Sequence, residues 1–363
     1  MQLPTVRFPR DTSAFTRTLR ERVDTYFKEN NLNRTGDWRM YLKTSLMLTM
    51  YFVPWALFTF GVTGTGVWFW VAEFVMGLGL AGIGLNVMHD ANHGAFSKSK
   101  VMNDVLGRTL DLVGGNAALW RIQHNVLHHT FTNIEGLDED IDTPGVLRFS
   151  PRRPLKPWHR FQHIYAWFFY AIMSLFWMTA KDWIAIGRYS KKGLIERSGT
   201  TKGKLISYLA VTKTLHFAYV IALPLLFSEL LLWQVLVGWM LMHAVAGLGL
   251  ASIFQLAHVM EHNIFPEAVK GDVMDSDPMA HQLKTTANFG TRSRLLTWMC
   301  GGLNHQIEHH LFPNICHVHH RKLAPIVEKT AKEFGLPYHS QTTFWSALRV
   351  HTRMLRSLGQ AAA

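Results

Sequence analysis

The sequence predicts an all-α membrane protein. Of its 363 residues, 48% are hydrophobic and only 17% are charged. The apolar positions gather in stretches of roughly the 20 residues that a helix needs to cross a bilayer. The length would also suit two soluble domains, but such stretches favour a single membrane-embedded unit. The chain is unusual in a second respect, because it contains 20 histidines.

Residues 1–43 are predicted to form a cytoplasmic N-terminal segment. They carry nine Lys or Arg and five acidic residues, and Phe15, Leu19, Val23 and Phe27 follow one another at helical spacing. The apolar core of a signal peptide does not follow the basic start. This segment is therefore expected to remain on the side where the protein is made.

Two apolar stretches, residues 44–62 and 67–87, come next, and each is long enough to span a bilayer. Only the uncharged turn at residues 61–66 joins them, so we expect a hairpin that returns the chain to its starting side at His89. Because Lys and Arg concentrate in cytoplasmic loops, the basic N-terminal segment marks that side as cytoplasmic.

The second half contains three apolar stretches, residues 164–180, 205–227 and 231–254. Residues 181–204 carry seven Lys or Arg and two acidic residues, so this loop is expected to be cytoplasmic. It would lie outside if residues 164–180 crossed the membrane. We therefore predict an interfacial helix at 164–180 and a second hairpin from the other two stretches, giving four transmembrane helices in two hairpins.

Histidines gather in four places, all at the expected cytoplasmic ends of these spans. The clusters are His89 and His93; His124, His128 and His129; His258 and His262; and His305, His309 and His310. Most pairs are four residues apart, which places both imidazoles on one face of a helix. A lone histidine at a span end is more often an ordinary interfacial residue, but four clusters on one side predict a metal site.

The number of histidines favours two metal ions over one. A single ion needs only about four ligands, whereas eight or nine candidate nitrogens are available, and imidazole suits iron, zinc, copper and nickel. Soluble di-iron bundles use carboxylates and paired ExxH motifs, and the sequence contains no ExxH. We therefore expect a nitrogen-dominated site with open positions for a small substrate such as dioxygen.

The motifs HDANHG, WRIQHNVLHHT, QLAHVME and NHQIEHHLFP make the chain resemble the membrane fatty acid desaturases with histidine boxes, over about residues 40–330. The third box begins with Gln306, which resembles the front-end type. The resemblance implies four spans under a cytoplasmic cap that holds a di-iron centre, with zinc as a possible substitute. Its implied iron ligands are His89, His93, His124, His128, His129, His258, His309 and His310, with Gln306 at a ninth position for which His305 is the alternative.

The resemblance also implies the organisation of the chain and its partners. A desaturase domain at residues 44–330 would lie between cytoplasmic segments 1–43 and 331–363, in a bacterial inner membrane or the endoplasmic reticulum. The substrates would be O2 and a fatty acyl chain carried by a lipid or CoA. The HPGG motif of a fused haem domain is absent from the sequence, so we expect no bound haem and a separate electron donor, either a ferredoxin or a b-type cytochrome.

Several further residues have both a functional and a simpler interpretation. Asp90, Asn92, Asn304 and Glu308 adjoin predicted ligands and could orient them, whereas His262 is more simply a polar supporting residue. The acidic run 135–142 is either a solvated face or a brace for box histidines. Candidate liners of an acyl tunnel, or simply packing residues, are Trp120, Phe131, Phe289 and Trp298.

Two alternative functions remain open at this stage. A hydroxylase would use the same scaffold and metal, since both reactions need a strong oxidant to attack unactivated methylenes. A metal transporter would place its ligands near the bilayer midplane, unlike clusters at span ends. No catalytic acid or base beyond the metal centre is predicted. The net charge of +12 is assigned to lipid headgroups or an acidic protein, so no nucleic-acid partner is expected.

Overall fold

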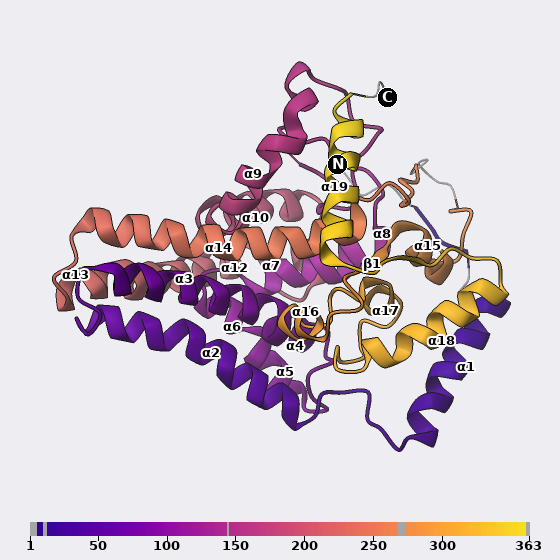
Figure 1. Cartoon of the computed structure of the whole chain (residues 1–363), viewed down its shortest axis with the longest axis horizontal. Coiled ribbons are helices and arrows are strands. Elements are labelled where there is room, and N and C mark those ends of the chain that lie inside the picture. Colours follow the sequence, from indigo (N-terminus) through magenta and orange to yellow (C-terminus); the bar gives the residue numbers. More distant parts are fainter. Residues whose placement is uncertain (1–5, 10–12, 144, 268–272, 361–363) are drawn as a thin grey trace. The chain divides into compact units, whose positions relative to one another are not determined.

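The computed structural model describes residues 6–9, 13–143, 145–267 and 273–360. Parts of the predicted terminal segments, residues 1–5, 10–12 and 361–363, lie outside the described residues. The chain divides into two compact units. Unit 1 comprises Asp37–Ile122 and Trp167–Ser252, and unit 2 comprises the described residues of Leu3–Gly36, Gln123–Ala166 and Ile253–Ala363. Both units are mainly helical (Figure 1).

Unit 1 contains the long apolar helices. Its elements are α2 (Trp38–Thr59), α3 (Val67–Gly82), η1 (Ile83–Met88), α4 (His89–Asn92), α5 (Lys100–Gly107), α6 (Thr109–Leu112), α7 (Ala117–Arg121), η4 (Trp177–Lys181), α10 (Asp182–Lys191), α11 (Leu194–Arg197), α12 (Lys202–Phe217), η5 (Ala218–Ala222) and α13 (Leu223–Phe227). The helices α9 (Gln162–Phe176) and α14 (Leu232–His258) each belong partly to this unit.

Three helices among the described residues are long and apolar enough to cross a membrane: Val67–Asn92, Lys202–Phe227 and Leu232–His258. They cover three of the four predicted spans. The remaining predicted span lies in α2, which has 22 residues and carries Pro54 inside the helix, and α2 does not belong to this set of three. Helix α9, the predicted interfacial segment, is likewise not one of the three.

Small residues allow α3 to lie close against α2, and the two helices run side by side in Figure 1. A Cβ atom on Gly79 would come within 2.7 Å of the backbone nitrogen of Tyr51, so only glycine permits this approach. The opposite side of α2 exposes apolar side chains, among them Leu42, Val53 and Leu57. Such a surface is suited to lipid.

Unit 2 contains shorter helices and one small sheet. Its elements are α1 (Ala14–Glu29), α8 (His129–Phe131), η3 (Pro157–Phe161), α15 (Pro278–Thr285), β1 (Ala287–Phe289), α16 (Arg294–Met299), α17 (Gln306–Leu311), α18 (His320–Glu333), β2 (His339–Gln341) and α19 (Phe344–Leu358). Strand β1 pairs with β2 in parallel, with Ala287 opposite His339.

The core of unit 2 confirms the helix predicted from the N-terminal spacing. Ser13 caps α1 by accepting a hydrogen bond from the backbone N–H of Thr16. The residues at the predicted spacing, Phe15, Leu19, Val23 and Phe27, are all buried. They share one core with residues of α15, α17 and α18, including Ile307 and Val327. Helices α1 and α18 lie side by side, so this core fixes the helix that carries the third histidine box.

Two π-helical segments lie at the first two histidine clusters. Segment η1 ends at Met88, directly before His89, and η2 (Ile122–His128) contains both His124 and His128. π-Helical turns are rare and often occur at functional sites. They also change which residues share a face, because hydrogen bonds run from i to i+5 and side chains five apart come together.

Candidate metal centre

In unit 1, the first cluster forms a pair of imidazoles, of which His89 is buried and His93 is half-buried. The ring centroids of His89 and His93 lie 4.8 Å apart, and the Trp120 ring lies 5.6 Å from His89 and 5.7 Å from His93. Asp90 Oδ1 lies 3.6 Å from His89 Nδ1. Trp120, a predicted tunnel residue, therefore packs on the first histidine pair.

Asn92 connects elements of unit 1. Its Oδ1 accepts a hydrogen bond of 2.7 Å from Arg121 Nε, and its Nδ2 donates one of 3.2 Å to the carbonyl oxygen of Gly107. These bonds join α4 to α5 and α7. Asn92 thus stabilises the backbone on which the first pair is carried.

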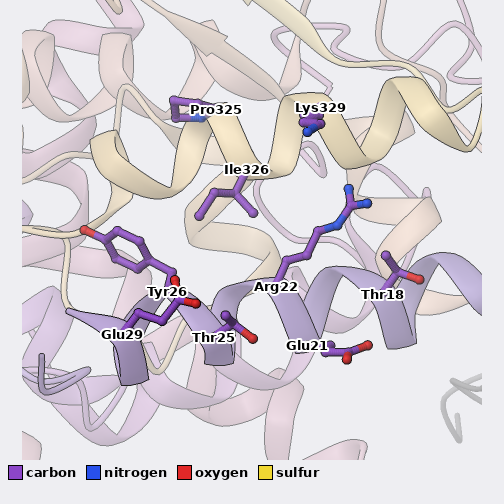
Figure 2. A pocket seen from close by; sticks show the side chains of 9 residues that line it. All are labelled: Thr18, Glu21, Arg22, Thr25, Tyr26, Glu29, Pro325, Ile326 and Lys329. Atoms are coloured by element: carbon purple, nitrogen blue, oxygen red, sulfur yellow. The ribbon is translucent and has the colours of Figure 1, made fainter. Parts of the chain in front are cut away.

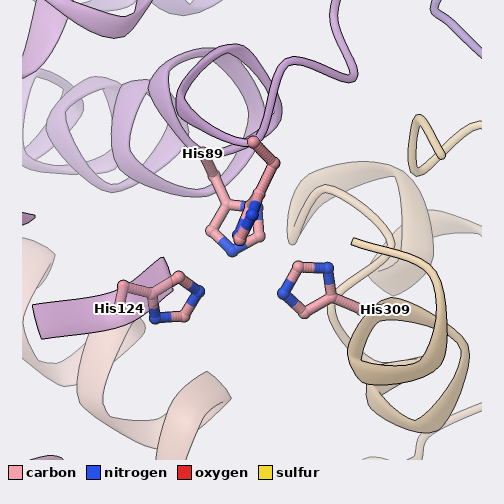
Figure 3. A group of neighbouring side chains, drawn as sticks. His89, His124 and His309 are labelled. Carbon is pink, nitrogen blue, oxygen red and sulfur yellow. The ribbon is translucent and has the colours of Figure 1, made fainter. Parts of the chain in front are cut away.

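In unit 2, η2 and α8 bring the second cluster close to His309 on α17. His129 Nε2 lies 3.2 Å from His124 Nε2 and 3.0 Å from His309 Nε2. Figure 3 shows the rings of His124 and His309 turned toward each other, with their centroids 6.0 Å apart. Each imidazole carries at most one N–H when neutral, whereas one cation between them would satisfy all their lone pairs.

Two overlapping groups of possible donors complete the cluster in unit 2. The first contains His128, His258 and His310, and the second contains His129, His309 and His310; within each group the ligand atoms lie within 4.8 Å of one another. The two groups share His310, so together they contain five histidines. All of these except His129 are buried. Together with His124, the six predicted histidine ligands of unit 2 lie in one place.

Two carboxylates of the acidic run hold His128. Its Nδ1 lies 3.0 Å from Asp138 Oδ1 and 3.4 Å from Asp140 Oδ2. Burial alone would lower the pKa of His128, but the two carboxylates outweigh it and raise the pKa to about 9. Within the part of the chain that the structure describes, His128 Nε2 is buried without a hydrogen-bond partner. A metal that displaced the proton on Nε2 would leave Nδ1–H bound to Asp138, as in the carboxylate–histidine pairs of metal sites.

A glutamine that the sequence analysis did not single out contacts the third box. Gln282 Oε1 lies 2.9 Å from His310 Nδ1, and Gln282 Nε2 donates a hydrogen bond of 2.8 Å to the carbonyl oxygen of His129. It lies far along the chain from both histidines, so no local motif could have indicated it.

The start of the third box differs from a continuous helix. His305 is the N-cap and α17 begins at Gln306, so His305 is not on the helical face of His309. Gln306 is fully buried, and neither atom of its amide has a hydrogen-bond partner among the described residues. His305 Nδ1 lies 3.7 Å from Glu308 Oε2, and Glu308 accepts hydrogen bonds from Asn288 and Tyr338.

Other predicted residues lie apart from the donor groups. His262 follows the end of α14, is exposed and stacks on His339 with ring centroids 5.2 Å apart. Asn304 donates to Thr297 Oγ1 at 3.0 Å and so stabilises a loop. Cys300 and Cys316, which are not predicted ligands, are both buried.

The predicted tunnel residues of unit 2 lie in three different settings. Phe289 is buried in β1, Phe131 stacks on Phe8 at 6.4 Å, and Trp298 is 42% exposed. A cavity of about 730 Å³ lies between α1 and α18 (Figure 2), and another of about 450 Å³ lies beside Arg152. None of these three aromatic residues lines either cavity.

The apolar helices are typical of a membrane protein, and the imidazole clusters offer groups of possible metal ligands. A comparison with protein families matches residues 65–342 to the fatty acid desaturases, and the chain belongs to this family. It is therefore an oxidoreductase that introduces double bonds into fatty acyl chains, which confirms the resemblance seen in the sequence.

Similar proteins extend over nearly the whole chain. It is 37% identical to an sn-1 linoleoyl-lipid 6-desaturase of Synechocystis sp., over 96% of each chain. It is 36% identical to an acyl-lipid (8-3)-desaturase of Physcomitrium patens, over 94% of this chain and 71% of that protein. It is 33% identical to an sn-1 linoleoyl-lipid 6-desaturase of Arthrospira platensis, over 95% of this chain and 92% of that protein.

Proposed function

We propose that the chain is a front-end acyl-lipid desaturase with a di-iron centre. The observation that carries this proposal is the pair of overlapping imidazole donor groups in unit 2. The proposed ligands are His89, His93, His124, His128, His129, His258, Gln306, His309 and His310. Zinc could replace iron, because it binds nitrogen sites more tightly than iron(II) does.

The residues present fit such a metal. Neutral imidazole is a good ligand for iron, and His128 offers a buried nitrogen that no described residue contacts by a hydrogen bond. The proposed donors are mainly uncharged imidazoles. Asp138 does not belong to the donor groups, because it contacts Nδ1 of His128 and not Nε2. Open coordination positions would then remain for dioxygen.

The reaction removes two hydrogens from adjacent methylenes and reduces O2 to two waters, using two further electrons and two protons. When bound, iron and dioxygen supply the oxidant that unactivated C–H bonds require. The chain itself holds the imidazoles, excludes water by burial and fixes the position of the acyl chain. The two electrons would come from a separate donor, a ferredoxin or a b-type cytochrome.

The names of the similar proteins support a lipid-linked substrate. Two of them are linoleoyl-lipid 6-desaturases and one is an acyl-lipid desaturase. Together with Gln306 at the start of the third box, these names favour an acyl lipid as the substrate and attack between an existing double bond and the carboxyl end.

We further propose four spans in two hairpins, with the metal centre in a cap on the cytoplasmic side. The three apolar helices and the apolar outer face of α2 support the spans, and the basic residues 1–43 and 181–204 support the orientation. The desaturase domain would cover residues 44–330, with interfacial segments that include α9.

Expression in a host fed linoleic acid tests the function. Gas chromatography with mass spectrometry should detect a new double bond on the carboxyl side of the existing ones, and His309→Ala should abolish it. His262→Ala is the matched control, because His262 is exposed and outside the donor groups. A hydroxylated product, or a double bond only on the methyl side, would contradict the proposal.

A further inference from the structure

We propose that Gln282 is a positioning residue that fixes His310, the imidazole that belongs to both donor groups of unit 2. This inference rests on the proposed function, since it takes His310 as a metal ligand. Gln282 lies on α15 and is 5% exposed. A glutamine side chain this deeply buried needs partners for both ends of its amide.

Both ends of the amide bind the histidine boxes. Gln282 Oε1 lies 2.9 Å from His310 Nδ1, on the third box. Gln282 Nε2 donates to the carbonyl oxygen of His129, on the second box, at 2.8 Å. One side chain therefore joins two ligand-bearing segments that are distant in the sequence.

Thr132 strengthens this connection. Its hydroxyl oxygen lies 2.7 Å from the carbonyl oxygen of His128 and 2.9 Å from Gln282 Oε1. It also lies 3.4 Å from His310 Nδ1. The amide of Gln282 is thus held from the second box through both Thr132 and His129.

Helix α15 is itself firmly placed, so Gln282 is a rigid support. Asp277 caps the helix by accepting hydrogen bonds of 3.0 Å from the backbone N–H groups of Met279 and Ala280. His281, the residue directly before Gln282, has its Nε2 2.9 Å from the carbonyl oxygen of Thr132. The segment that carries Thr132 is therefore tied to α15 twice.

The chemical consequence is a fixed tautomer for His310. An amide oxygen only accepts hydrogen bonds, so Nδ1 of His310 carries the proton and Nε2 keeps its lone pair for a metal. Because His310 belongs to both donor groups, a rotated or wrongly protonated ring would weaken both. Loss of such outer partners typically costs about 10–100-fold in metal affinity.

The test uses Gln282→Leu and Gln282→Glu, with Gln162→Leu as the matched control. Gln162 is also fully buried and makes three hydrogen bonds, but to the backbone of Arg148 and Leu355 and not to a histidine. Metal-free full-length protein in detergent is titrated with Co²⁺ and followed by visible absorption, with the melting temperature of each metal-free variant recorded in parallel.

We expect Gln282→Leu to weaken Co²⁺ binding by about 10–100-fold relative to Gln162→Leu at a comparable melting temperature. Gln282→Glu should restore part of the affinity and shift the absorption bands, because a carboxylate still accepts from Nδ1 and makes His310 more basic, but it cannot donate to the carbonyl oxygen of His129. Equal affinities in Gln282→Leu and Gln162→Leu, or an affinity of Gln282→Glu no higher than that of Gln282→Leu, would overturn the inference alone. Wild-type protein without any Co²⁺ bands would overturn the di-metal proposal as well.

Discussion

Asp138 Oδ1 lies 3.0 Å from His128 Nδ1, and both side chains are completely buried. The other oxygen of Asp138 accepts a hydrogen bond of 2.8 Å from the backbone N–H of Asn133, so the carboxylate cannot turn freely. The buried charge is stabilised only while both contacts persist. Asp138 therefore fixes the orientation of His128 more closely than Asp140, whose Oδ2 lies 3.4 Å from the same ring nitrogen.

The first prediction concerns this contact. Asp138→Asn keeps the size of the side chain but removes the charge, so metal affinity should fall by about 10–100-fold. The iron content of purified protein after dialysis measures the loss. Asp142→Asn is the control, since Asp142 lies in the same acidic run and pairs with Arg153. Equal losses in the two variants would show that Asp138 has no special role.

The second prediction concerns metal content. Protein purified from iron-supplied cells should contain about two iron atoms per chain, and elemental analysis would measure this directly. His128→Ala should lower the content and abolish activity. Full activity at one iron per chain would contradict a two-metal site.

The sequence predicted the helices well where apolar spacing determines them. Phe15, Leu19, Val23 and Phe27 lie on one buried face of α1 because residues four apart share a side of a helix. The first histidine cluster shows the limit of this reasoning. Helix Val67–Asn92 continues through η1 past the predicted end at residue 87, and no residue pattern marks a π-helical turn.

The sequence indicated which histidines would gather, but not which residues would hold them in place. The six histidines that gather in unit 2 could be identified from their residue type and their spacing, because each box is a local motif. Which carboxylate of the acidic run would bind His128 depends on how the loop after α8 folds back, and this cannot be read from spacing. Gln282 has no local signal at all, since its partners come from two distant segments.

The third prediction concerns stability at low pH. His351 is fully buried and its Nδ1 lies 2.8 Å from the carbonyl oxygen of Val259, and burial lowers its pKa from 6.5 to about 4. Between these values the unfolded chain binds a proton that the folded chain does not, so stability should fall as the pH decreases from 6.5 to 4.

Each pKa unit of this difference corresponds to about 1.4 kcal/mol. His351→Gln keeps a donor for Val259 but cannot take up a proton, so it should flatten the decline of the melting temperature over that pH range. His262→Gln alters an exposed histidine and should leave the decline unchanged. If the melting temperature of His351→Gln declined as steeply as that of the wild type, His351 would not be the cause of the decline.

The fourth prediction concerns orientation in the membrane. Lys191, Thr65 and Glu229 are exposed, and a cysteine at each can be labelled in sealed vesicles with a membrane-impermeant reagent. Lys191→Cys should react only from the cytoplasmic face, and Thr65→Cys and Glu229→Cys only from the outer face. The native cysteines are buried, so their background is expected to be low. Labelling of Lys191→Cys from outside would mean that residues 164–180 cross the membrane.

The fifth prediction decides between Gln306 and His305 at the ninth ligand position. Gln306 is the first residue of α17 and lies three residues before His309, so the two share a side of the helix. Its buried amide has no hydrogen-bond partner among the described residues. Such a group is costly to bury unless a metal, or a water bound to it, contacts the amide. His305 is the N-cap outside the helix. Its ring nitrogens are likewise buried without a hydrogen-bond partner among the described residues, and Nδ1 lies 3.7 Å from Glu308 Oε2.

Gln306→His should therefore keep metal and part of the activity, because it places a nitrogen at the same position. Gln306→Leu should lose most turnover, and His305→Ala should have a mild effect. Double-bond formation and iron content, measured in the same preparations, separate loss of chemistry from loss of metal. An inactive His305→Ala beside an active Gln306→Leu would assign the ninth position to His305, one residue earlier in the chain.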